Sequence, residues 1–121
     1  MIRGMKFATV PVRDQEMALD FYTQKLGMRI LTDQPFNEKQ RWIELGIPGA
    51  DTGVVLFTPD GHESRIGTFL GVSFWSDDVN KTYAELTAKG VKFTAPPKTE
   101  EWGTSSVFAD QDGNQFALSS K

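Results

Sequence analysis

The order of secondary-structure signals occurs twice along this chain, and this repeat constrains the fold more than any other feature. Residues 6–14 alternate in polarity and end at Asp14, a good helix N-cap. The stretch QEMALDFYTQKLG then predicts a helix that ends at Gly27, with Glu16 in its first turn. Its apolar face is Ala18, Phe21, Tyr22 and Leu26. Three strand patterns follow: MRILT, RWIEL and VVLF.

The same order of elements returns after a stretch rich in turn residues, TPDGHESRIGT. LGVSFWSDD predicts a strand that ends at acidic caps, and VNKTYAELTAKG predicts a helix that ends before Gly90. VKFT, SSVFA and QFALS predict three more strands, with APPKTEEWGT as a loop and DQDGN as a tight turn. We therefore predict one α+β domain made of two βαβββ modules, about 5–58 and 68–121, with a connector at about 58–68.

Composition excludes several classes of function. A net charge of −3 and a pI near 5.1 argue against nucleic-acid binding, which usually needs a basic face. The absence of cysteine excludes disulfides, thiolate metal sites and cysteine nucleophiles. No apolar run reaches the roughly 18 residues of a membrane span, and the first residues lack the features of a secretory signal. We expect a cytoplasmic protein without membrane or nucleic-acid partners.

Motifs in both halves resemble those of the vicinal oxygen chelate superfamily, which contains glyoxalase I, bleomycin-resistance proteins and extradiol dioxygenases. The first half carries VPVRDQEMALDFYTQKLGM, and the second carries SDDVNKTYAELTAKGVKF, WGT and DQDGNQFAL in the family's order. The resemblance covers nearly the whole chain. It implies a curved, eight-stranded mixed sheet that forms a cup, with the helices on its outer face, and it also implies a homodimer.

The resemblance also implies four metal-ligand positions, which this chain does not fill with ligands. They map to Phe7, Val55, Gly71 and Ala117. None of these side chains has the nitrogen, oxygen or sulfur donor that a divalent metal needs. We therefore expect neither metal nor cofactor in the cup. The single histidine, His62, lies in the connector near Asp60 and Glu63, where it is either a metal ligand or simply solvated.

Alternation along the strands predicts which side chains face the cup. Val10, Val12, Ile43 and Leu45 suit the helix-covered side, and so do Val107 and Ala109. The residues predicted to bind a ligand are Phe7, Thr9, Trp42, Val55, Phe57, Ser73, Trp75, Ser106, Phe108, Gln115 and Ala117, with Trp102 from the loop before the seventh strand.

The aromatic members of this set suggest two interpretations. Phe7, Trp42, Phe57, Trp75 and Phe108 could line an apolar pocket for a flat organic molecule. Alternatively, the rings fill the cup and leave no cavity. Three tryptophans would be costly filler, because a fully buried indole needs a hydrogen-bond partner, and this favours the pocket.

Glu44 is the single candidate catalytic residue. Desolvation among aromatic rings would raise the pKa of its carboxyl group and suit it for proton transfer near neutral pH. If ionised, it could instead pair with a cationic ligand held over tryptophan. A purely structural alternative is a salt bridge to Arg41 or Arg29.

Three functions remain open at this stage. The first is a metal-free module that binds a small hydrophobic or cationic aromatic molecule, as bleomycin-resistance-like members do. The second is a glyoxalase-type lyase or isomerase: a metal-independent version would use Glu44 as general base, whereas a metal-dependent one would need ligands absent here. The third is a filled cup that serves protein binding, because fold alone does not determine function.

Overall fold

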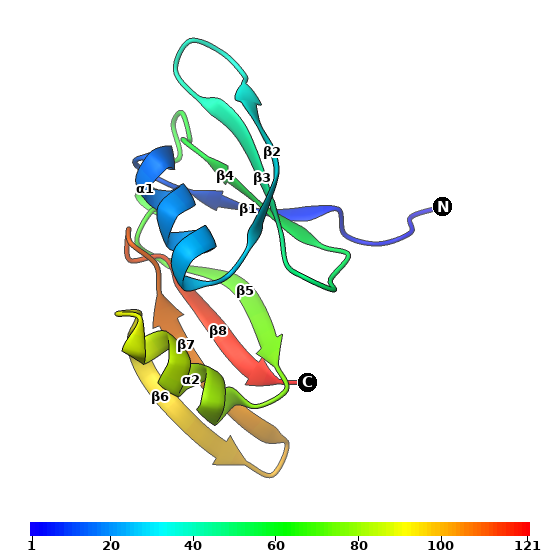
Figure 1. The fold of residues 1–121 in the computed structure, drawn as a ribbon, viewed down its shortest axis with the longest axis vertical. Helices are drawn as coiled ribbons and strands as arrows, with labels where there is room; N and C mark the ends of the chain where they lie inside the picture. Colours follow the sequence, from blue (N-terminus) through cyan, green and yellow to red (C-terminus); the bar gives the residue numbers. More distant parts are fainter. The chain divides into compact units, whose positions relative to one another are not determined.

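The computed structural model describes residues 1–121 and divides into two compact units, Met1–Ile66 (unit 1) and Gly67–Lys121 (unit 2). Each unit contains a four-stranded mixed sheet and a helical segment (Figure 1). The α+β class and the repeated order of elements are therefore confirmed. No helix is both long enough and apolar enough to cross a membrane.

Unit 1 contains all the elements predicted for the first module. They are β1 (Phe7–Pro11), α1 (Gln15–Asp20), the π-helical segment η1 (Phe21–Lys25), β2 (Arg29–Pro35), β3 (Arg41–Gly46) and β4 (Gly53–Phe57), followed by a short 3₁₀ turn, η2 (Glu63–Arg65). The strand order is β1-β4-β3-β2. β1 pairs with β4 in parallel, and the other pairs are antiparallel.

Local signals at both ends of the first helix work as the sequence predicts. The Asp14 side chain accepts hydrogen bonds from the backbone N–H groups of Glu16 and Met17. Gly27 follows the helix with a φ of +74°, a left-handed conformation that favours glycine. The π-helical second half was not predicted; there Leu26 N donates to Phe21 O, five residues back.

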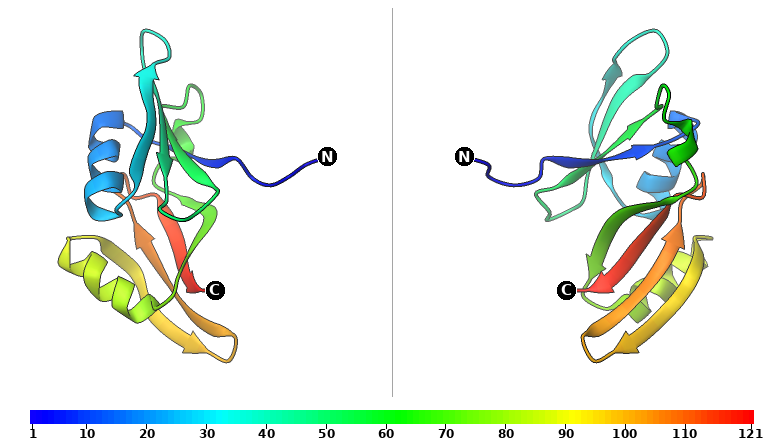
Figure 2. Two further views of the ribbon diagram at one scale, coloured as in Figure 1. Left: turned by 45° about the vertical axis from the view of Figure 1, so that its right-hand side comes forward. Right: turned by 180° about the vertical axis from the view of Figure 1, so that it is seen from behind.

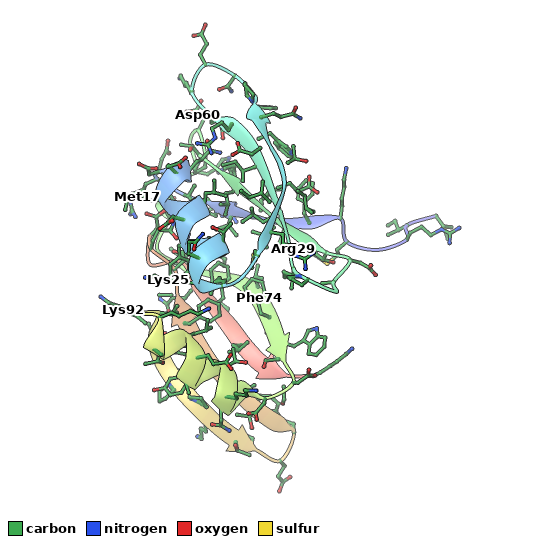
Figure 3. All side chains as sticks on the ribbon, in the orientation of Figure 1. Met17, Lys25, Arg29, Asp60, Phe74 and Lys92 are labelled. Carbon is green, nitrogen blue, oxygen red and sulfur yellow. The ribbon has the colours of Figure 1, made fainter.

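The core of unit 1 lies between α1 and one face of its sheet (Figure 2, left view). The fully buried side chains of the strands and helix include Val10, Ile43, Leu45, Leu56, Ala18 and Tyr22. Met17 projects from α1 away from the sheet, and it is 61% exposed (Figure 3). The sequence pattern therefore predicts the buried face of the helix correctly.

Gln15 attaches the start of α1 to two strands. Its side-chain Nε2 donates to the carbonyl oxygens of Arg41 (2.7 Å) and Leu56 (3.0 Å), and its Oε1 accepts from Arg41 N at 2.9 Å. Gln15 is only 9% exposed. A single amide therefore satisfies three backbone groups at the start of β3 and near the end of β4, and the sequence pattern did not reveal this role.

Unit 2 contains β5 (Phe69–Ser76), α2 (Val79–Ala88), β6 (Lys92–Glu100), β7 (Gly103–Ala109) and β8 (Gln115–Ser120). The strand order is β5-β8-β7-β6, which repeats that of unit 1. Asp78 caps α2 by accepting a hydrogen bond from Lys81 N. β6 is longer than predicted, because the stretch through Pro96 and Pro97 continues the strand. Its edge position and two register shifts tolerate residues that cannot donate a backbone hydrogen bond.

The core of unit 2 is aromatic. Phe108 packs against Phe74, Phe93 and Phe116, with ring centroids 5.6–6.1 Å apart. Tyr83 of α2 meets Phe93 edge-on at 4.7 Å. Tyr83 belongs to α2 and the other rings come from the four strands of the sheet, with Phe74 contributed by β5 (Figure 3). Offset and edge-on ring pairs add stability beyond the area that they bury.

The turn between β7 and β8 is held by two buried polar side chains. Asp110 Oδ1 accepts from the backbone N–H groups of Asp112 and Asn114, and its Oδ2 accepts from Asn114 Nδ2 at 2.9 Å. Asn114 Oδ1 accepts from Gly67 N at 2.9 Å. Asn114 is fully buried. The acidic, glycine-containing turn therefore has a structural role at the start of unit 2.

Candidate ligand-binding faces

Each sheet has one face covered by the helix of its own unit and a second face without a helix, here called the helix-free face. Residues that pair directly across neighbouring strands share a face, so the register assigns each side chain. Within each unit, this assignment can be compared with the alternation expected from the sequence.

In unit 1, the helix-free face carries the residues that alternation predicts. Thr9 and Glu44 both pair with Val55, whereas the buried Ile43 and Leu45 pair with Leu56 and Val54. The predicted residues on this face are Phe7, Thr9, Trp42, Glu44, Val55 and Phe57.

Three aromatic rings gather on the helix-free face of unit 1. Phe7 and Trp42 meet edge-on with centroids 5.8 Å apart, although they come from β1 and β3. The ring centroid of Phe36 also lies 5.9 Å from that of Trp42, and Phe36 is 62% exposed. Sequence reasoning missed Phe36 because it falls in the polar loop after β2; a lone aromatic in such a loop was the available signal.

In unit 2, the helix-free face is smaller in its side chains and less aromatic. Ser73 pairs with Ala117, and Trp75 pairs with Ser119. Gln115 pairs with Ala109, and its Oε1 accepts a hydrogen bond from Thr94 Oγ1 at 3.2 Å. Trp75 is 55% exposed, and Lys121 Nζ lies 4.5 Å from its ring centroid.

The predicted orientation of β7 was wrong. Ser106 and Phe108 pair with Leu118 and Phe116, which lie under α2, so both are core residues rather than cup residues. Ser106 Oγ donates to Leu118 O at 3.2 Å. Val107 and Ala109 occupy the helix-free face instead. Both alternating sets of side chains in β7 contain apolar residues. Alternation alone therefore cannot show which set faces α2.

Trp102 lies on neither helix-free face. It is in the tight turn that closes the β6–β7 hairpin after the Glu100–Gly103 pair, and it is 69% exposed. Trp102 therefore belongs to a hairpin turn rather than to a strand, because the β6–β7 pairing extends further than the predicted loop allowed.

Glu44 is half-buried beside Trp42, and it forms neither of the salt bridges considered from the sequence. Arg41 lies on the opposite face, where Nη2 contacts Asp33 at 2.8 Å and Nη1 contacts Glu16 at 2.7 Å. Across from Glu44 are Val55 of β4 and Thr32 of β2. The carboxylate thus lies on a face with three aromatic rings.

The ion pair between Arg41 and Asp33 predicts that the free energy of unfolding depends on pH. Hydrogen bonding from Arg41 outweighs partial desolvation and holds the pKa of Asp33 below its ordinary value of 3.8. The same contact with Asp33, followed by that with Glu16, raises the pKa of Arg41. Because the pKa of Asp33 is lower in the folded state, its stabilising contribution is complete above the unfolded value and is lost as pH falls through the folded value.

We therefore expect Asp33→Asn to lower the free energy of unfolding by about 0.5 kcal/mol at neutral pH, since both side chains are partly exposed. The difference from wild type should disappear below the folded pKa of Asp33. Urea unfolding across the acidic range measures this. Asp51→Asn, at an exposed position, is the matched control. A difference that persists unchanged in acid would contradict the assignment.

The four positions that correspond to metal ligands do not fit a divalent ion. Phe7, Val55 and Ala117 offer only carbon, and Gly71 has no side chain. Gly71 also lies within a register irregularity of β5 with a φ of +74°, where a side chain would strain the backbone. No group of three or more His, Cys, Asp or Glu residues is arranged to hold a metal.

The connector around His62 has its own local structure. Glu63 Oε1 accepts a hydrogen bond from Gly61 N at 3.2 Å. This bond, after one from the backbone of Glu63 itself, lowers the pKa of the Glu63 carboxyl group, with a smaller contribution from His62. The carboxylate is thus used to shape the turn.

A surface hollow of about 440 Å³ lies elsewhere in unit 1. The start of α1, the end of β2 and the β2–β3 turn line it, including Glu16, Lys39 and Arg41. None of the predicted site residues belongs to it. Its open, mixed-charge lining differs from the apolar pocket that suits a flat organic ligand.

Comparisons with known proteins agree with the motifs and the fold. The Glyoxalase/Bleomycin resistance protein/Dioxygenase superfamily model matches residues 4–118. The chain is 33% identical over 118 residues to the uncharacterized protein YetH of Bacillus subtilis (strain 168), with 98% of each chain covered.

Two solved structures resemble the chain over almost its full length. One is a member of the same superfamily from Sphaerobacter thermophilus DSM 20745, with a TM-score of 0.90, 37% identity, and coverage of 99% of this chain and 98% of that chain. The other is TnmS3, an antibiotic binding protein from Streptomyces sp. CB03234, with a TM-score of 0.82, 35% identity, and coverage of 98% and 96%.

Proposed function

The chain belongs to the Glyoxalase/Bleomycin resistance protein/Dioxygenase superfamily, and from this we propose that it binds a flat, largely apolar small molecule without a metal ion. The ligand lies against the aromatic side chains of the helix-free face of unit 1. The observation that carries this proposal is the row of rings formed by Phe7, Trp42 and Phe36 on a face with no helix of its own unit.

Two further observations support binding. TnmS3, which is 35% identical, is described as an antibiotic binding protein. The four positions of the family's metal ligands lack donor atoms, so a mode of binding that depends on surface complementarity fits this chain better than one that depends on coordination. The exposed indole of Trp75 offers a second aromatic surface in unit 2.

Trp42→Ala should weaken binding of a neutral flat probe, 1-methylnaphthalene, by about tenfold, because a central aromatic side chain typically contributes this much. Isothermal titration calorimetry measures the affinity. Trp102→Ala is the matched control, since Trp102 lies at an exposed hairpin turn, and it should leave the affinity unchanged. Equal effects of the two substitutions would contradict the proposed site.

The metal-free part of the proposal has a separate test. Elemental analysis of the purified protein should find no stoichiometric Ni, Zn, Fe or Mn, and added chelator should leave probe affinity unchanged. One tightly bound equivalent whose removal abolishes probe binding would reject this part.

A lyase or isomerase is the second candidate, favoured by the half-buried position of Glu44 beside Trp42. A general base must reach the proton that it removes. If a substrate is found, loss of turnover in Glu44→Gln with binding retained would assign catalysis, whereas unchanged turnover would exclude Glu44 as the base.

We also propose a homodimer, which light scattering would test.

A further inference from the structure

We infer that the ligand held on the helix-free face of unit 1 is an organic cation, recognised jointly by the Glu44 carboxylate and the faces of the surrounding aromatic rings. This inference rests on the proposed function and deepens it, because it names the charge of the ligand. It follows from three observations: an unpaired carboxylate, a row of rings beside it, and lysine ammonium groups already positioned over rings.

The carboxylate of Glu44 has no partner within the protein. It forms no salt bridge or side-chain hydrogen bond, and the sequence neighbour Arg41 is held by two other carboxylates on the opposite face. Val55, its partner on β4, offers no charge. A half-buried carboxylate is stabilised by an opposite charge within about 4–6 Å, and a bound cation would supply it.

Arg29 is the basic residue closest to Glu44 in register on this face. It pairs with Gly46, two residues beyond Glu44 along β3, and it is exposed (Figure 3). It forms no salt bridge with Glu44. Its charge opposes the binding of a cation, so its removal should have the opposite effect to the removal of Glu44.

The aromatic rings add attraction of the same sign. Trp42 lies two residues from Glu44 on the same face, and its ring contacts those of both Phe7 and Phe36. The face of an aromatic ring carries negative potential and attracts a cation within about 6 Å of its centroid. Rings and carboxylate therefore select a ligand with a flat apolar body and a positive charge.

The protein's own lysines show this preference. In unit 1, Lys6 Nζ lies 5.9 Å from the centroid of the Phe7 ring. In unit 2, Lys121 Nζ lies 4.5 Å from the centroid of Trp75, whose indole is 55% exposed. In each unit, therefore, a ring among the residues proposed to bind ligand already has an ammonium group over it. A ligand cation would make the same interaction after it displaces that ammonium group, because two positive charges over one ring repel each other.

The experiment compares two probes of the same shape. The cation 1-methylquinolinium and neutral 1-methylnaphthalene differ essentially in charge, and calorimetry measures the affinity of each for the wild-type protein at low ionic strength. We expect the cationic probe to bind at least about tenfold more tightly than the neutral probe. Added salt should lower the affinity of the cationic probe only. Tighter binding of the neutral probe would overturn the inference and leave the proposed function intact; failure of both probes to bind would overturn both.

Two variants test the residues. Glu44→Gln, which keeps the shape of the side chain, should lower the affinity for the cationic probe by about tenfold and change the affinity for the neutral probe by less than about twofold. Arg29→Gln should raise the affinity for the cationic probe by about twofold to threefold. An equal loss of both probes in Glu44→Gln would show a structural role and overturn the inference, as would weaker cation binding in Arg29→Gln. If either variant fails to fold, the comparison of the two probes on the wild-type protein still tests the inference.

Discussion

Asn114→Ala should lower the free energy of unfolding by about 3 kcal/mol, the larger of two destabilisations expected from buried amides. The substitution removes the hydrogen bonds to Asp110 Oδ2 and from Gly67 N, both 2.9 Å long. A buried polar group left without its partner costs about 1–3 kcal/mol, and the Asp110 carboxylate is the group affected in this way, because Gly67 is exposed and its N–H can bind water. Because Asn114 is fully buried and Asp110 is 7% exposed, water cannot readily replace the lost amide.

Chemical denaturation of the variant and wild type measures this difference. Asn80→Ala is the matched control, because Asn80 is exposed on α2 and should tolerate alanine without loss of stability. A decrease below about 1 kcal/mol in Asn114→Ala would show that the turn holds its shape without the side-chain network. The expected result would also show that the turn between β7 and β8 has a structural role that does not depend on a metal ligand at Ala117.

Gln15→Ala should lower the free energy of unfolding by a similar amount, about 2–3 kcal/mol. The side chain bonds to three backbone groups that alanine would leave without these partners: Arg41 N, Arg41 O and Leu56 O. These groups lie at the ends of β3 and β4 that adjoin Trp42 and Phe57. We therefore expect probe binding on the helix-free face to weaken as well.

Gln15→Glu separates hydrogen bonding from packing. Glutamate keeps the acceptor for Arg41 N but replaces the donor to two carbonyl oxygens with a negative charge, so it should destabilise the fold at least as much as alanine at neutral pH. Gln24→Ala, on the exposed side of η1, is the control and should have little effect. If Gln15→Glu had the same free energy of unfolding as the wild type, this result would contradict the observed hydrogen bonds of Gln15.

The resemblance to a known family was confirmed, but the candidate site could be predicted only in part. In unit 1, every residue predicted for the cup lies on the helix-free face, because Ile43 and Leu45 clearly mark the opposite parity as apolar. In β7 the same reasoning failed, since Val107 and Phe108 are both apolar and only pairing with β8 distinguishes them. Phe36 was missed because its contact with Trp42 joins a loop to a strand.

The sequence by itself determined what depends on neighbouring residues along the chain. The capping by Asp14 and Asp78, the glycines that follow each helix, and the doubled order of elements are all read within a few residues. Tertiary structure alone decided the rest. The orientation of β7, the continuation of β6 through its prolines, and the partners of Gln15 and Asn114 depend on contacts between segments that are distant in sequence. The physical reason is that burial and hydrogen bonding are satisfied in space, where local periodicity does not specify the partner.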